Sequence, residues 1–230
     1  VSGNAYTGEE GYVGLRRGIL QGQYNSWSQG SSCMKVAASD NIVVFRASEV
    51  AFLRAEGALR GWNMGGSPKD LYEAGIRLSF EENNISSGVE SYLANTGKVE
   101  GYKDPLKGQS GQTYDYSGSI NTAVTVAWAG GDFEKSLEQI ITQKWIANFP
   151  NGMESWSEYR RTGYPKLMPM AANASSGIVD DTEGARRMPY PTDEYRENKE
   201  SVEAAVLTLT QESKTKKGDS MATHVWWDCK

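Results

Sequence analysis

The chain has 230 residues, which is the size of one large domain or of a domain with appendages. Its composition, 38% hydrophobic and 23% charged, is that of a globular protein and excludes disorder as the main state. The formal net charge is −5 and no basic run is longer than a pair such as Lys216-Lys217, so we expect no nucleic-acid partner. The longest apolar runs are about four residues, far short of the roughly 20 that a membrane-spanning helix needs.

The two ends of the sequence leave two points open. The chain opens at Val1 without an initiator methionine or a signal segment, so we expect a processed product or a fragment. Cys33 and Cys229 lie 196 positions apart, which permits one long-loop disulfide but no C-x-x-C metal or redox motif. Whether these two cysteines pair is left undecided by the sequence.

The first ordered element is expected after a loop-rich lead-in over residues 1–46, which is dominated by Gly, Ser, Asn and aromatic residues. Residues 47–60 predict a helix, with Ser48 as its candidate N-cap and Gly61 as its stop. Small and apolar residues spread over a broad face of this helix: Val50, Ala51, Leu53, Ala55, Ala58 and Leu59.

A second helix is expected to follow at once. Ser67 before Pro68 is typical of a helix N-terminus, and apolar or small residues recur at helical spacing at Leu71, Ala74, Gly75 and Leu78. Residues 47–83 therefore predict an antiparallel helical hairpin of about 37 residues, close to the 34-residue tetratricopeptide unit. One hairpin cannot bury both of its faces, so the remaining surface must pack on other helices or on sequence outside this chain.

The rest of the chain, residues 84–230, predicts further helices and extended loops. Helical patterns fall at residues 88–94, 133–148, 152–161 and 201–211, and the most regular one puts Leu137, Ile140, Ile141 and Trp145 on one face. Residues 96–119 and 186–191 read as loop or extended chain, and the last residues show a short β-like alternation. The predicted fold class is all-α, with tetratricopeptide-like helical hairpins and long irregular loops.

Residues 144–165 are the densest group of aromatic and charged side chains. On the helix over residues 152–161, Trp156 and Arg160 are spaced for a cation–π contact and Glu158 and Arg161 for an ion pair. A ligand groove is one interpretation. We favour an internal brace in which Trp145, Trp156 and Tyr159 pack and the arginines bind loop carbonyls or carboxylates.

Several kinds of enzyme are disfavoured. The single histidine, His224, lacks an evident partner and is expected to be structural, and the motifs GxSxG, GxxxxGK[ST] and GxGxxG are absent. Asp115, Ser117 and Asn121 form a loose group of oxygen ligands without the features of a calcium loop, so we expect a solvated loop, no metal and no cofactor. The 29 acidic residues guarantee accidental carboxylate pairs and say nothing about a glycosidase.

Four blocks of sequence, in order along the chain, carry a family resemblance: SEVAFLRAEGALRGWNMGG with LYEAGIRLSFEE, then KWIANFPNGMESWSEYRRTGYPKLMP, then RRMPYPTDEYREN, and GDSMATHVWWD. Together they resemble the C-terminal part of SusD/RagB-family outer-membrane lipoproteins. The resemblance implies that residues 1–230 are part of a longer all-α domain built on tetratricopeptide hairpins. It also implies a surface-exposed location, with a lipid anchor that this chain does not contain.

The function implied by the resemblance is non-catalytic. Such proteins capture an oligosaccharide, or in some members a peptide, for a TonB-dependent (SusC-like) outer-membrane transporter. Their glycan contacts come from loops ahead of the hairpin, and the matching region here contains Tyr24, Asn25 and Trp27. Aromatic rings present flat faces to sugar C–H groups, and an Asn side chain both donates to and accepts from hydroxyls.

Two other functional classes are kept beside this one. The main alternative is a tetratricopeptide-like scaffold that binds the transporter while ligand specificity lies elsewhere. Trp27 would then only anchor its loop. An enzyme, chiefly a glycosidase, is the least favoured.

Overall fold

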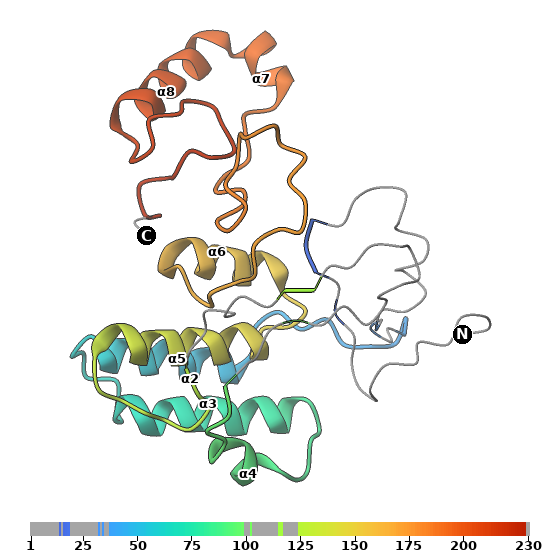
Figure 1. Cartoon of the computed structure of the whole chain (residues 1–230), viewed down its shortest axis with the longest axis vertical. Helices are drawn as coiled ribbons and strands as arrows, with labels where there is room; N and C mark the ends of the chain where they lie inside the picture. Colours follow the sequence, from blue (N-terminus) through green and yellow to red (C-terminus); the bar gives the residue numbers. More distant parts are fainter. Residues whose placement is uncertain are drawn as a thin grey trace. The chain divides into compact units, whose positions relative to one another are not determined.

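The structure, a computed structural model, describes residues 37–98 and 124–228, together with residues 14, 16–18, 32, 34, 102, 115 and 116 (Figure 1). Within these residues the chain forms helices and no strand, apart from an isolated antiparallel bridge between Tyr102 and Tyr116. The predicted all-α class is therefore confirmed. The chain divides into two compact units, which we name the helical unit (residues 36–100 and 119–167) and the C-terminal unit (residues 1–35, 101–118 and 168–230).

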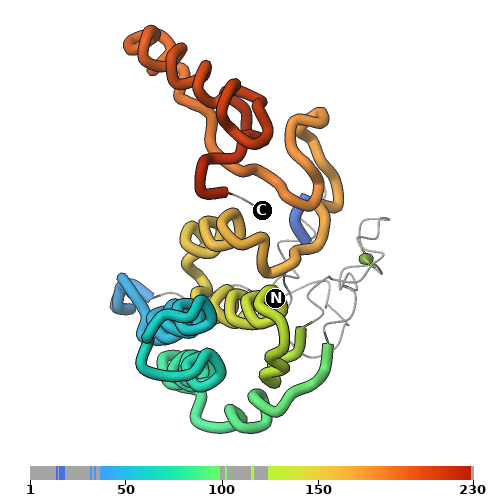
Figure 2. The backbone as a smooth tube through the Cα atoms, turned by 90° about the vertical axis from the view of Figure 1, so that its left-hand side faces the viewer, coloured from blue at the N-terminus to red at the C-terminus, as the bar shows by residue number. Residues whose placement is uncertain are grey.

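The helical unit is built on the predicted hairpin. Its elements are α2 (Ala47–Leu59), α3 (Pro68–Glu82), α4 (Val89–Leu93), α5 (Phe133–Ala147) and α6 (Gly152–Thr162). Helix α2 packs along both α3 and α5, which brings segments far apart in sequence side by side (Figures 1 and 2). The five helices match the predicted positions within one residue at either end.

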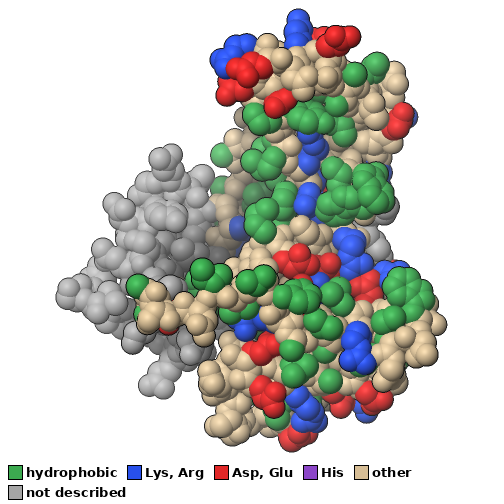
Figure 3. Space-filling view, turned by 180° about the vertical axis from the view of Figure 1, so that it is seen from behind, with side chains coloured by type: hydrophobic (Ala, Val, Ile, Leu, Met, Phe, Trp, Pro, Cys, Tyr) green, Lys and Arg blue, Asp and Glu red, His purple; other side chains and the backbone are tan. Residues whose placement is uncertain are grey.

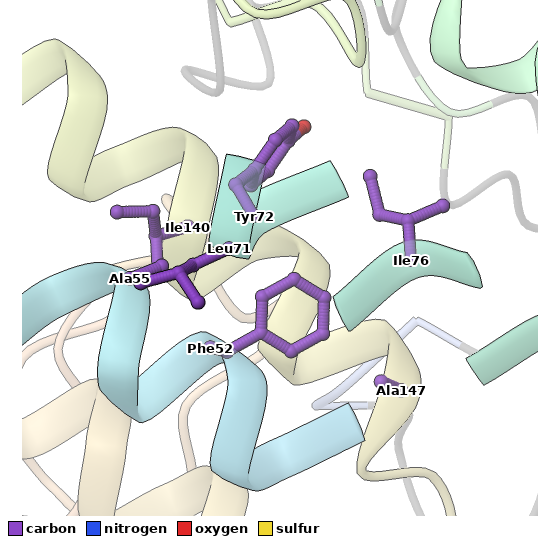
Figure 4. Close-up of a cluster of buried hydrophobic side chains, with 7 residues drawn as sticks. All are labelled: Phe52, Ala55, Leu71, Tyr72, Ile76, Ile140 and Ala147. Atoms are coloured by element: carbon purple, nitrogen blue, oxygen red, sulfur yellow. The ribbon is translucent and has the colours of Figure 1, made fainter. Parts of the chain in front are cut away.

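The core of the helical unit is a cluster of side chains from α2, α3 and α5 (Figure 4). Its fully or almost fully buried members are Phe52, Ala55, Leu71, Tyr72, Ile76, Ile140 and Ala147. The closest approach is at Gly75 of α3, where an added Cβ would lie 2.8 Å from the ring of Phe52. The absence of a side chain at Gly75 is thus what lets α3 close on α2.

The buried face of α2 differs from the predicted one. Phe52 is completely buried, whereas Val50 and Leu53 are 38% and 41% exposed. Small and apolar residues cover so much of this helix that its sequence pattern alone allows several different faces to be the buried one. The bulk of Phe52 against Gly75 selects one of them.

The two hairpin helices are capped in different ways. Ser67 caps α3 as predicted, because its hydroxyl accepts a hydrogen bond of 3.2 Å from the backbone N–H of Asp70. Ser48 is not the cap of α2, whose N-cap is Arg46. Instead, the backbone N–H and the hydroxyl of Ser48 donate to the carboxylate of Glu82, at 3.0 and 2.6 Å. A carboxylate from the end of α3 thus accepts hydrogen bonds from the first turn of α2. The sequence around Ser48 alone does not predict this partner.

The C-terminal unit contains α7 (Thr192–Glu197) and α8 (Lys199–Glu212). Helix α8 was predicted, but the six-residue α7 was not. The chain after α8 forms turns rather than the strand-like structure that its alternation suggested. Buried ion pairs hold these turns: Arg186 binds Asp228, and Asp219 accepts from Arg187 and, at 2.6 Å, from the hydroxyl of Tyr195.

Candidate functional site

The site predicted from the sequence falls outside the described residues. This holds for Tyr24, Asn25 and Trp27, and also for the two cysteines, Cys33 and Cys229. The ligand-binding role of the first three and the pairing of the last two therefore stay predictions.

The loose oxygen-ligand group is only partly described. Ser117 and Asn121 lie outside the described residues, and the backbone carbonyl of Asp115 accepts a hydrogen bond of 3.2 Å from Arg16. Across the described part of the chain, no three His, Cys, Asp or Glu side chains are arranged to hold a metal ion.

His224 is buried in the C-terminal unit. Its Nδ1 atom lies 3.2 Å from the backbone oxygen of Asp228, and its Nε2 atom lies 3.4 Å from the carboxylate of Glu183. Both ring nitrogens thus face oxygen atoms, one four positions away in the chain and the other in a distant segment of the same unit. This surrounding is that of a structural histidine, the role expected from the sequence.

Residues 144–165 form the corner between α5 and α6, and its inner side is an ion-pair cluster. Lys144 on α5 is only 1% exposed. Its Nζ atom lies within ion-pair distance of three carboxylates: those of Glu49 at 3.4 Å, Glu154 at 3.3 Å and Glu158 at 3.5 Å. Lys144 therefore joins α5 both to α2 and to α6.

Arg161 extends the same cluster. Its guanidinium lies 2.6 Å from the carboxylate of Glu56 on α2 and 2.8 Å from that of Glu158 on its own helix. Arg60 approaches Glu56 to 2.8 Å from the other side. We call the group of Glu49, Glu56, Arg60, Lys144, Glu154, Glu158 and Arg161 the ion-pair cluster. It is the brace that the sequence analysis favoured, with carboxylates as the partners of the arginine.

Two carboxyl groups of the cluster, those of Glu49 and Glu56, have pKa values shifted in opposite directions. Burial alone raises the pKa of Glu56, but its hydrogen bonds and ion pairs with Arg161 and Arg60 outweigh burial and hold this pKa below the ordinary 4.5. The pKa of Glu49 lies above 4.5, because burial outweighs the attraction of Lys144. Glu56 is thus stabilised as an anion by two arginines, whereas Glu49 has one cation, Lys144, within ion-pair distance in the described part of the chain.

The predicted pairs within α6 are both present. The guanidinium of Arg160 stacks 3.6 Å from the ring centroid of Trp156, and Arg161 pairs with Glu158 as described above. Tyr159 is buried, as a packing role requires.

The outer side of the same corner holds an open cavity of about 540 Å³, which we call the corner pocket. Its walls include the half-buried Trp145, the exposed Phe149 and Pro150, and its polar side chains are those of Asn151 and Ser155. Phe149 is 65% exposed, one of several large hydrophobic side chains at the protein surface. Figure 3 shows one face of the molecule on which hydrophobic side chains reach the surface among acidic and basic ones.

Short hydrogen bonds fix the turn beneath the corner pocket. The backbone N–H of Asn151 donates to the carbonyl of Asn148 at 2.6 Å, and that of Gly152 donates to Pro150 at 2.8 Å. The side-chain oxygen of Asn151 caps α6 by accepting from the backbone N–H of Glu154 at 3.3 Å. The pocket is therefore carried by a fixed turn between two helices.

A second cavity, of about 310 Å³, lies between α4, α5 and residues 124–126. It is more polar. Its lining includes Gln143, which accepts a hydrogen bond of 2.9 Å from the hydroxyl of Tyr92, and Thr142, whose buried Oγ1 has no hydrogen-bond partner among the described residues. Ile146 lines both cavities, so they lie on either side of one residue of α5.

Sequence reasoning included Trp145 but missed Phe149, its partner in the corner pocket. The available signal was their spacing of four residues, which places two aromatic rings on one side at the end of α5. A packing role for Trp145, which its place in the helical pattern of α5 favours, hides this signal.

None of the helices in the described residues is long and apolar enough to cross a membrane.

The fold and the two cavities define an all-helical protein built on a tetratricopeptide-like hairpin, with open cavities at its surface. The family model for SusD-like proteins, described as SusD and RagB outer membrane lipoproteins, matches residues 2–228. The chain belongs to this family. A comparison with curated proteins gives no match.

Solved structures of SusD homologues match nearly the whole chain. One from Bacteroides ovatus is 89% identical, with a TM-score of 0.92, over 100% of this chain and 46% of its own. One from Bacteroides thetaiotaomicron is 46% identical, with a TM-score of 0.84, over 99% and 47%. A homologue from Flavobacterium johnsoniae, described as chitin-binding, is 41% identical, with a TM-score of 0.81, over 95% and 43%. The chain thus spans less than half the length of these relatives.

Proposed function

We propose that the chain is part of a non-catalytic glycan-binding protein at the cell surface that delivers oligosaccharides to a TonB-dependent outer-membrane transporter. The observation that carries the proposal is the 41% identity, over 95% of this chain, to a SusD homologue described as chitin-binding. The family's description as outer membrane lipoproteins supports the location. Because the relatives are more than twice as long as this chain, we further propose that it corresponds to the C-terminal part of the family domain.

The proposed glycan contacts include Tyr24, Asn25 and Trp27. Support comes from their chemistry: two aromatic residues three positions apart flank an amide, within a segment rich in glycine and serine. Such a segment has few apolar neighbours that would bury the rings, so stacking on sugar faces is the use we propose for them.

The proposal is tested by calorimetric titration with oligosaccharides of N-acetylglucosamine, the sugar of chitin. We expect binding by the unaltered chain. Trp27→Ala should weaken it by about 1–3 kcal/mol, roughly 5- to 150-fold, with little change in melting temperature. Trp62→Ala is the matched control, because Trp62 is an exposed tryptophan, 63% exposed, on the loop between α2 and α3.

Two results would contradict the proposal. If Trp27→Ala leaves the affinity unchanged and lowers the melting temperature by several degrees, Trp27 packs rather than binds, and the scaffold function is favoured. If the chain binds no oligosaccharide in a wider glycan panel but binds short peptides, the ligand class is wrong.

A further inference from the structure

The corner pocket combines the groups that recognise an uncharged, hydroxylated ring. Trp145 and Phe149 provide two aromatic side chains, and Asn151 and Ser155 provide an amide and a hydroxyl. Its volume of about 540 Å³ falls within the roughly 300–1,000 Å³ of small-molecule sites. Apolar walls with a few polar groups are also the usual composition of such sites.

The charges around the corner select against an ionic ligand. None of the described residues that line the pocket is charged. The nearby cation of Lys144 is buried and already faces three carboxylates on the inner side of the corner. A carboxylate, phosphate or ammonium group in the pocket would lose its hydration without gaining an opposite charge, so a neutral ligand is favoured.

The pocket is also held in shape before any ligand arrives. The turn beneath it is fixed by the hydrogen bonds of Asn151 and Gly152, and α6 is tied to α2 through Arg161. A preformed pocket loses little conformational entropy when it binds a ligand, so even a small contact area can give measurable affinity.

From these observations we propose that the corner pocket is a second carbohydrate-binding site, separate from residues 24–27, that takes one or two neutral sugar units of the same glycan class. Phe149 and Trp145 stack on the sugar faces. The amide nitrogen of Asn151, which the capping of α6 does not use, donates to a hydroxyl or acyl oxygen. This inference rests on the proposed glycan-binding function and adds a location in the described structure.

An apolar protein partner is the competing occupant of the pocket. A protein interface of standard size buries about 800 Å² on each partner and draws most of its binding energy from a fully desolvated centre. The corner offers two aromatic side chains beside polar groups in a bounded cavity, which suits a ring with hydroxyl groups at its edge. A second copy of the chain is kept as an outcome of the test.

The test compares two phenylalanines of similar exposure, Phe149 at 65% and Phe45 at 60%. Phe149→Ala removes an aromatic wall of the pocket, and Phe45→Ala removes a ring that is 60% exposed elsewhere on the same unit. Asn151→Ser keeps a side-chain oxygen for capping α6 but removes the amide donor. Each variant is titrated with the oligosaccharide that binds the unaltered chain most tightly in a glycan panel, and its sedimentation velocity is measured.

At the corner pocket, which the titration reports as a binding event beside that of residues 24–27, we expect Phe149→Ala to weaken the affinity roughly 5- to 30-fold and Asn151→Ser roughly 2- to 10-fold. Melting temperatures should be nearly unchanged, and Phe45→Ala should bind normally. If the chain binds the glycan and Phe149→Ala binds equally well, the corner pocket is not a sugar site, while the proposed function stands. If the unaltered chain dimerises and Phe149→Ala is monomeric, the pocket is a protein interface. If the chain binds no glycan at all, both proposals fail.

Discussion

Removal of the charge of Lys144 tests the ion-pair cluster most directly. In Lys144→Met the side chain keeps its length but no longer faces the carboxylates of Glu49, Glu154 and Glu158. Among the described residues, Lys144 is the only cation within ion-pair distance of Glu49, which is itself 5% exposed. Removing one partner of a buried ion pair costs about 3–5 kcal/mol, because the other charge is left without compensation.

The same reasoning gives three measurable quantities. For a chain of this size, a loss of about 3–5 kcal/mol lowers the melting temperature by roughly 6–20 °C. Adding Glu49→Gln to Lys144→Met removes the uncompensated charge, so the double variant should recover about 1–3 kcal/mol as a coupling energy. Lys69→Met is the control and should cost at most about 1 kcal/mol, because Lys69 forms an exposed pair with Glu73 at 3.7 Å.

The effect of pH follows from the raised pKa of Glu49. In Lys144→Met that pKa rises further, so the folded protein binds a proton more readily than the unfolded chain does. The stability lost in the variant should therefore be largest at neutral pH and should shrink as the pH falls towards the ordinary pKa of 4.5. Urea denaturation followed by far-UV circular dichroism, at neutral pH and at about pH 5, measures both values. A loss below about 1 kcal/mol, or strictly additive single and double variants, would refute the cluster's role.

Two further predictions concern the helical unit. Gly75→Ala should be less stable than its control Gly57→Ala by about 1–3 kcal/mol in thermal denaturation. The new methyl group at position 75 meets the buried ring of Phe52, whereas the one at position 57 meets the flexible side chain of Met64. Equal stabilities of the two variants would contradict the close packing of α2 and α3. Glu56→Gln should lower the free energy of unfolding at neutral pH, and it should weaken the fall of that free energy as the pH is lowered. The reason is that a carboxyl group with a lowered pKa contributes stability above about pH 4.5 that is lost as the pH falls. An unchanged pH dependence on the acid side would show that the pairs of Glu56 with the arginines contribute nothing.

The helices could be predicted because their signals are local. Ser67 before Pro68, and the repeating apolar positions of α5, specify helices within a few residues. Helix α7 has six residues and begins directly after Pro191, which is too short for a period to show. Helix α7 was therefore not predicted because it is short, not because its residues disfavour a helix.

Features that depend on distant segments could not be predicted. Glu82 accepts a hydrogen bond from Ser48, 34 positions earlier, in the first turn of α2. Lys144 forms an ion pair with Glu49, 95 positions earlier. Lysine is almost never fully buried unless it is paired with an opposite charge. Because the partner Glu49 is distant in sequence, the residues next to Lys144 do not predict its burial. The rotation of α2 that buries Phe52 likewise depends on Gly75 of another helix.

The candidate site was predicted only in part, for the same reason. The ties within α6 follow from spacings of three and four residues, and both are present. The corner pocket depends instead on which side of α5 stays open, a property of the packed helices. That Phe149 is 65% exposed while Lys144 is 1% exposed follows from the packing of α5 against α2 and α6, which the local sequence does not show.

Lys144 and Trp145 are neighbours in sequence but serve opposite sides of the corner. The lysine side chain turns inward to three carboxylates, and the tryptophan lines the pocket outside. Arg161 ties α6 to Glu56 on α2, in surroundings where an unpaired charge is costly. If the corner pocket is the sugar site proposed above, the buried charges contribute to binding indirectly, because they hold α6 against α2 beside a pocket whose described lining carries no charge.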